Sequence, residues 1–218
     1  AVAGGLDGYV ADPYCQGEDL EMPLLAWLGG EVEAQRAQPG HAEDPLVLVG
    51  DVLGTGSLGR WALAAPDGEG FLAGLLGALR PTIVGLGNGE FHQGGERLGR
   101  YLSALREAGL TAGAANLICD ADGRTLCGRT AGAAETVAEV AGRRLGFVAL
   151  QMEDLTGKVD EALLEGLSFG DPRTAASQAS ERLRGAGAEL VVAVVHRGRS
   201  DVSEGDVLAF AEALGGQV

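Results

Sequence analysis

Three polar residues follow predicted strands and could gather at one edge of a sheet. Asp51 follows the apolar run 45–49, His196 follows the run 189–195, and Asn88 lies in a glycine-rich loop after a third, β-branched run. In open α/β folds, ligands sit at the carboxyl ends of the strands. A carboxylate, an amide oxygen and an imidazole are groups that bind divalent cations. These three residues could therefore hold one ion.

Two more polar residues, Glu90 and His92, share the loop of Asn88, and both are further candidates for the site. Simpler roles exist for such residues, because a lone histidine is usually a hydrogen-bonded polar residue and an aspartate after a strand is sometimes only a helix cap. The position of Asp51 before the Asn88 loop favours a ligand role.

The same loop has a second interpretation as a nucleotide-binding turn. Gly85-Leu86-Gly87 resembles the start of a dinucleotide fingerprint, which opens a helix after a strand. That fingerprint needs a third glycine at position 90, and the residue there is Glu90. The sequence therefore argues against a Rossmann-like nucleotide site.

The loop 87–92, Gly-Asn-Gly-Glu-Phe-His, resembles the Gly-Asn-His-Glu-Phe-Asp signature of the 5′-nucleotidase branch of the calcineurin-like metallophosphoesterases, with four of six positions matching. In that family the Asn is a metal ligand and the following His assists the leaving group. The resemblance implies a ligand role for Asn88. It also implies that Gly89 stands where the family has its His, so no catalytic residue is assigned.

Other motifs extend the resemblance along the chain. A Gly-Asp pair that ends in Asp51 is similar to the family's pair whose carboxylate bridges two metal ions, and His196 stands in a His-x-Gly context where the family has a metal ligand. Gly5-Leu6-Asp7-Gly8 falls on the family's Asp-x-His-Gly motif, where Gly5 offers no ligating side chain and Asp7 could ligate as a carboxylate. The implied metal ligands are Asp51, Asn88, His196 and Asp7, with His92, Glu90 and Cys15 as other candidates.

The resemblance implies an α/β fold in which layered sheets are flanked by helices, an α/β/β/α sandwich. It covers nearly the whole chain as one domain, residues 1–218. The family's last strand, which delivers a Gly-His-x-His motif, and the nucleoside-binding domain that often follows are not in this sequence. We therefore expect an incomplete domain, which another chain or segment could complete.

The implied activity is metal-dependent hydrolysis of phosphate monoesters with manganese, zinc or magnesium. Two-metal phosphoesterases clamp the phosphate between ions about 3.5–4 Å apart and lower the pKa of a bound water. Because Gly5 and Gly89 replace family side chains, we expect a degenerate centre with weak or lost hydrolysis and a binding or structural role. The alternative is an active nucleotide hydrolase in which Asp7 or His92 takes over a ligand role.

Charge restricts the partners of the chain. The formal net charge is −15, and the isoelectric point is about 4.5. Long-range repulsion disfavours nucleic-acid polymers and anionic membrane surfaces. A small phosphorylated molecule fits if a metal supplies local positive charge. No window of the sequence has the apolar length of a membrane span.

The three cysteines of the chain bear on whether the protein lies in an oxidising cellular compartment. Cys119 and Cys127 flank a stretch with an Asp-Gly turn signal and could face one another across a hairpin, while two unpaired thiols fit equally well. A disulfide would indicate an oxidising compartment, so the expected location is periplasmic or extracellular. Cys15 has no evident partner and is either a reactive thiol or a plain loop cysteine.

Several elements are predicted by periodicity and capping. A helix is expected over 20–38 with an interruption at Gly29-Gly30, and another over 96–108 that stops at Gly109. Asp171 at the N-cap, followed by Pro172, predicts the start of a later helix.

Overall fold

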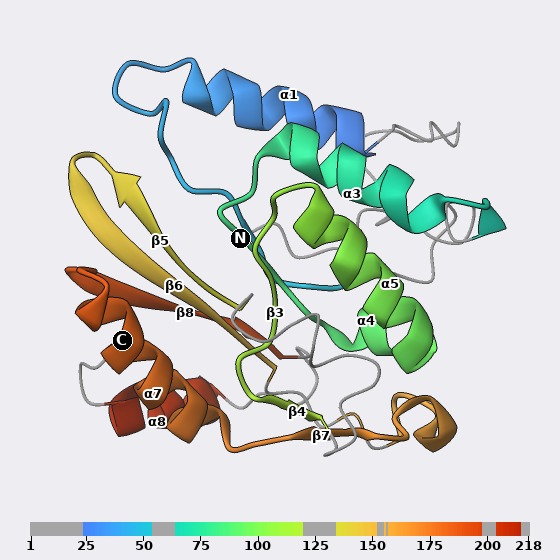
Figure 1. The fold of residues 1–218 in the computed structure, drawn as a ribbon. Helices are drawn as coiled ribbons and strands as arrows, with labels where there is room; N and C mark the ends of the chain where they lie inside the picture. Colours follow the sequence, from blue (N-terminus) through green and yellow to red (C-terminus); the bar gives the residue numbers. More distant parts are fainter. Residues whose placement is uncertain are drawn as a thin grey trace.

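The computed structural model describes residues 24–53, 64–119, 134–151, 155, 157–197 and 204–214 (Figure 1). In chain order the elements are α1 (Leu24–Arg36), β1 (Val47–Leu48), α3 (Gly68–Leu79), β2 (Ile83–Gly85), α4 (Asn88–Phe91), α5 (Gly94–Glu107), β3 (Ala112–Gly113), β4 (Leu117–Cys119), β5 (Glu135–Val140), β6 (Arg143–Gln151), a 3₁₀ turn η1 (Glu161–Leu163), β7 (Leu167–Phe169), α7 (Pro172–Gly185), β8 (Leu190–His196) and α8 (Glu204–Leu214).

Three small sheets contain the strands. The first has the order β1-β2-β3 and is parallel throughout. In the second, β5 and β6 are antiparallel, and β8 pairs with β6 in parallel, with Gln151 opposite His196. The third is the antiparallel pair β4 and β7. Parallel pairing places the carboxyl ends of β1 and β2 at one edge of their sheet.

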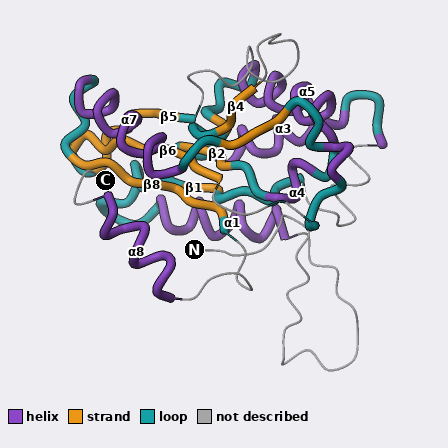
Figure 2. Tube along the Cα trace, turned by 90° about the horizontal axis from the view of Figure 1, so that it is seen from below, coloured by secondary structure: helices purple, strands orange, loops and turns teal. Residues whose placement is uncertain are grey.

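The two larger sheets pack face to face between helices, with strands in the middle and helices at the periphery (Figure 2). Helices α3 and α5 form one core with the first sheet, and α7 and α8 form another with the second. Between the sheets lie four buried residues, Ile83, Phe147, Ala149 and Val194. The predicted α/β/β/α sandwich is therefore confirmed.

Strand β6 packs against helices on one face and against the first sheet on the other. Val148 and Leu150 pack against α7 and α8, while Phe147 and Ala149 face the first sheet. Successive side chains of a strand point to opposite faces, so a continuous apolar run is what a strand covered on both sides requires.

The ends of two helices follow their predicted signals. Helix α7 begins after Asp171, whose Oδ1 accepts a hydrogen bond from the backbone N–H of Thr174 at 2.7 Å. Pro172 occupies its first turn. Gly109, with φ +77°, comes directly after Ala108, the C-cap of α5, and takes the left-handed conformation that ends many helices.

The predicted interruption of α1 is wrong, because the helix continues through Gly29 and Gly30. A Cβ on Gly29 would lie 3.5 Å from Cδ2 of Leu79, so the glycine stands where α1 approaches α3. Tertiary packing outweighs the low helix propensity of glycine here. Within the described residues, no helix combines the length and apolar character that a membrane-spanning helix needs.

Candidate metal centre

The chain bends sharply after β1, and this bend presents Asp51. Gly50 has φ +116° and Asp51 has φ +58°, so two consecutive residues lie in the left-handed region. A Cβ on Gly50 would lie 2.7 Å from the carbonyl carbon of Leu86, so only glycine allows this close approach to the loop after β2. A left-handed aspartate costs about 1–2 kcal/mol, and its surroundings must hold it in place.

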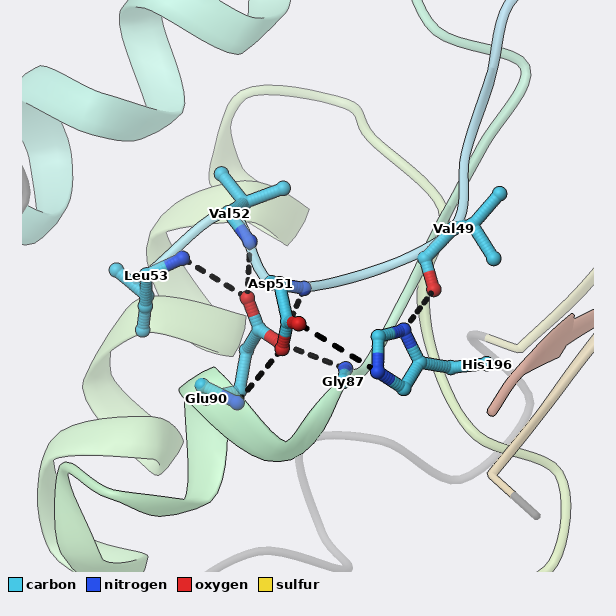
Figure 3. A network of polar contacts seen from close by, with 8 residues as sticks. Val49, Asp51, Val52, Leu53, Gly87, Glu90 and His196 are labelled. Carbon is cyan, nitrogen blue, oxygen red and sulfur yellow. Dashed lines mark hydrogen bonds and ion pairs between the residues drawn. The ribbon is translucent and has the colours of Figure 1, made fainter. Parts of the chain in front are cut away.

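Asp51 faces His196 at the ends of strands from different sheets. Oδ2 of Asp51 lies 3.5 Å from Nε2 of His196 (Figure 3). The imidazole is largely buried, with 13% of the side chain exposed, and the Asp51 side chain is 36% exposed. The pair is therefore held by the fold and can still be reached from solvent.

The other imidazole nitrogen fixes the orientation of His196. Nδ1 lies 3.2 Å from the carbonyl oxygen of Val49. Since a carbonyl only accepts, this contact requires the proton on Nδ1. In the neutral ring, Nε2 then presents a lone pair to the Asp51 carboxylate, and two electron-rich groups at this distance need a proton or a cation between them.

Two glycines of the next loop line the same space. The backbone N–H of Gly89 donates to Oδ1 of Asp51 at 2.7 Å. A Cβ on Gly87 would clash with Oδ1 of Asp51 and lie 2.7 Å from Cε1 of His196. Asn88 lies between these glycines as the first residue of α4 and is half-buried. The loop that carries Asn88 thus contacts Asp51 through its backbone.

Glu90 is fully buried beneath this loop, and its carboxylate accepts four backbone hydrogen bonds (Figure 3). Oε1 accepts from Val52 at 2.6 Å and from Leu53 at 2.9 Å. Oε2 accepts from Asp51 at 2.9 Å and from Gly87 at 2.6 Å. Burial raises the pKa of the Glu90 carboxyl, the N–H groups oppose that rise, and the nearby charge of Asp51 adds to it. All four partners of the Glu90 carboxylate are backbone N–H groups, so these hydrogen bonds hold the backbone of the two loops in place.

The remaining sequence candidates lie in different places. His92 directly follows the last residue of α4 and is half-buried. Cys119 is the last residue of β4. Asp7, Cys15 and Cys127 lie outside the described residues.

The donor set fits a divalent cation with few protein ligands. Within the described ranges, no group of three or more His, Cys, Asp or Glu side chains could hold an ion. At the strand ends, Asp51 and His196 form a pair of such side chains, to which Asn88 of the adjacent loop could add an amide oxygen. Carboxylate, imidazole and amide oxygen suit manganese, zinc or magnesium, and such sites keep positions for water or substrate.

Sequence reasoning missed two features of the centre. One is the Val49 carbonyl that orients His196, which a side-chain pattern cannot show. The other is the anchoring role of Glu90, for which a signal exists, since a glutamate three residues after a helix N-cap often accepts from the cap N–H. Glu90 stands in that relation to Gly87.

Comparison with known proteins agrees with the fold. No protein-family model matches the sequence, and no curated protein matches it. Among solved structures, a 5′-nucleotidase precursor from Thermus thermophilus is 26% identical, with a TM-score of 0.59, over 86% of this chain and 32% of its own. A 5′-nucleotidase-like protein from Staphylococcus aureus, solved with α-ketoglutarate, is 18% identical, with a TM-score of 0.70, over 98% and 42%.

A calcineurin-like phosphoesterase from Bacillus subtilis is also similar, at 18% identity and a TM-score of 0.64, over 92% of this chain and 61% of its own. The chain spans about a third of the length of the first of these relatives. The chain therefore has the metallophosphoesterase fold, and its structural neighbours are 5′-nucleotidases and calcineurin-like phosphoesterases.

Proposed function

We propose that this domain holds one divalent cation at Asp51, His196 and Asn88 and binds phosphate monoesters, with hydrolysis weak or lost. The observation that supports the proposal most is the 3.5 Å approach of Oδ2 of Asp51 to Nε2 of His196, whose Nδ1 faces a carbonyl. A carboxylate and an imidazole lone pair at that separation are arranged as two ligands of one ion.

Electrostatics favours a cation at this place. Asp51 and the buried Glu90 interact unfavourably, since the charge of Asp51 raises the pKa of Glu90. A positive ion beside Asp51 would offset that repulsion. When bound, a divalent cation supplies positive charge for a phosphate group and acidifies its bound water. On a chain with a net charge of −15, local positive charge is what a phosphorylated ligand requires.

Weak hydrolysis follows from position 89. The resembling family has a histidine there that assists the leaving group, and a glycine side chain transfers no proton. The backbone N–H of Gly89 is already bonded to Asp51. General acid catalysis typically contributes 10²–10⁴-fold, so its loss alone would leave a slow enzyme or a binding protein.

The alternative is an active hydrolase with an altered ligand set. Its first candidate is His92, which directly follows the short helix that begins at Asn88. Asp7 is the other residue that would take over a ligand role. Under this alternative, turnover would depend on His92 or Asp7 as well as on Asp51.

A matched pair of variants tests the proposal. The chain contains a second Asp–His pair, Asp44 and His41, whose Oδ2 and Nδ1 atoms are 2.8 Å apart. Metal content by elemental analysis, with manganese and zinc back-titration, is compared for the natural chain, Asp51→Ala and Asp44→Ala. Turnover of p-nitrophenyl phosphate is measured on the same samples.

We expect one ion per chain, lost in Asp51→Ala and kept in Asp44→Ala, together with slow turnover or none. Robust turnover that His92→Ala or Asp7→Ala abolishes would support the alternative. If no ion binds, or if Asp51→Ala binds as well as the natural chain, the assignment of the metal centre is wrong.

A further inference from the structure

The segment 51–53 directs three consecutive backbone N–H groups toward one carboxylate. Asp51, Val52 and Leu53 all donate to Glu90, over 2.6–2.9 Å. Convergent N–H groups of successive residues form a concavity that binds anions. In this fold the anion is supplied by the chain itself, so the concavity after β1 is already filled from the loop after β2.

The fourth donor shows that Glu90 joins two loops. Gly87 precedes α4 and donates to Oε2 of Glu90 at 2.6 Å. One carboxylate therefore ties the bend that presents Asp51 to the loop that presents Asn88. Hydrogen bonds to a charged acceptor are about twice as strong as hydrogen bonds between neutral groups. Without the Glu90 carboxylate, the N–H groups that it accepts from would be buried without this partner, which costs stability.

The surroundings of Glu90 are apolar, which strengthens these bonds. Phe91 and Tyr101 are fully buried, and Val52 and Leu53 belong to the same hydrophobic core. Low local dielectric raises the electrostatic strength of a satisfied polar contact. Glu90 thus accepts from the backbone of the left-handed Asp51, while the N–H of Gly89 donates to the Asp51 carboxylate.

We propose that Glu90 is a positioning residue, whose carboxylate holds Asp51 in its left-handed conformation so that the Asp51 carboxylate faces His196. This inference rests on the proposed cation site, because positioning matters for function only if Asp51 and His196 bind an ion together. Glu90 touches neither the ion nor a substrate. Its effect passes through the backbone of Asp51 and the loop of Asn88.

The test compares Glu90→Gln with Glu69→Gln. Glu69 of α3 is another largely buried carboxylate, and its described ion pairs are with Arg97 at 3.3 Å and Arg100 at 3.2 Å, away from residues 51–53. Both variants replace one largely buried carboxyl group with an amide of about the same size. Zinc affinity is measured by calorimetry, and amide hydrogen exchange is measured on the metal-free proteins.

We expect Glu90→Gln to weaken zinc binding about 10–100-fold, the usual effect of losing a group that orients metal ligands. Amides 51–53 and 87 should exchange faster in this variant. Glu69→Gln should keep the zinc affinity and the exchange rates of those amides. If Glu90→Gln does not fold, Glu90→Asp keeps the charge with a shorter reach and should give the same changes in smaller measure.

The two readouts separate this inference from the proposed function. If the natural chain binds no zinc, the cation site fails, while exchange still tests the hydrogen bonds to Glu90. If amides 51–53 of the natural chain exchange as fast as exposed loop amides, the anchoring role is wrong. Unchanged zinc affinity in a folded Glu90→Gln protein with faster exchange would overturn the positioning role.

Discussion

The Nε2 atom of His196 lies 3.5 Å from Oδ2 of Asp51, although Asp51 follows a strand of one sheet and His196 is the last residue of a strand in another. This relationship depends on the packing of the two sheets against each other. Ile83 of one sheet and Phe147, Ala149 and Val194 of the other form that contact. The distance between Asp51 and His196 therefore depends on how the two sheets pack, and the variants below test which residues maintain it.

Gly87→Ala should separate the two residues of the pair. The backbone of Gly87, with φ −107° and ψ −176°, suits any residue, so the effect is purely steric. Its added Cβ would meet Asp51 Oδ1 and lie 2.7 Å from the His196 ring. We expect zinc affinity to fall by about tenfold or more, measured by calorimetry.

Gly74→Ala in α3 is the control for that change. A Cβ there meets nothing within 4 Å. Replacement of an exposed helical glycine by alanine stabilises a protein by about 0.5–1 kcal/mol, and zinc affinity should not change. If Gly87→Ala binds zinc as tightly as Gly74→Ala does, the glycine does not shape the site.

Phe91 and Phe169 should stabilise the fold as a pair. Their ring centroids are 5.3 Å apart at an interplanar angle of 81°, the edge-to-face arrangement that aromatic rings prefer. Phe91→Ala should lower the free energy of unfolding by about 3–5 kcal/mol. A double-mutant cycle with Phe169→Ala, measured by urea unfolding, should give a coupling of about 0.5–1.5 kcal/mol. Strict additivity of the two changes would contradict a direct contact.

Asn116 links segments beside the end of β6. Its Nδ2 donates to the carbonyl of Gln151 at 2.7 Å, and its Oδ1 accepts from the N–H of Gln151 at 3.0 Å. Asn116→Ala removes the side chain that bonds these buried groups, so the free energy of unfolding should fall by about 1–3 kcal/mol. The exposed Gln35→Ala should change stability by less than about 0.5 kcal/mol. Equal effects of the two changes would show that Asn116 is not a structural link.

Asp171 should make stability depend on acidity. The N–H and hydroxyl of Thr174 both donate to its carboxylate and lower its pKa below the ordinary 3.8. A lowered folded pKa adds stability above the unfolded value, and this is lost as the pH falls through the folded value. The Tm advantage of the natural chain over Asp171→Ala should shrink below about pH 3.8. The Tm advantage of the natural chain over Asp171→Asn should also shrink below that pH, because asparagine caps a helix without titrating.

Much of the architecture could be predicted from the sequence. The β-branched run before the Asn88 loop predicted β2, and the apolar run 189–195 predicted β8 within one residue at each end, because strands inside the sandwich are continuous apolar runs. The ends of these strands carry Asn88 and His196, as expected. What failed was a local expectation, since Gly29 allows α1 to approach α3 and does not interrupt it.

Other features of the centre could not be predicted. The left-handed conformation of Asp51 is supported by three hydrogen bonds from residues 51–53 to Glu90, and contacts between a backbone and a side chain so distant in sequence leave no periodic signal. The pairing of β4 with β7 joins segments that are far apart in sequence, and nothing in either strand specifies its partner.

The most direct test of the central claim is a zinc titration followed by nitrogen NMR of the histidine rings. The chain has three histidines, so each ring can be assigned, and His41 beside Asp44 is an internal control. The account predicts that the Nε2 resonance of His196 moves with one equivalent of zinc while the His41 resonances stay in place. A His196 ring that is unchanged at saturating zinc would contradict it.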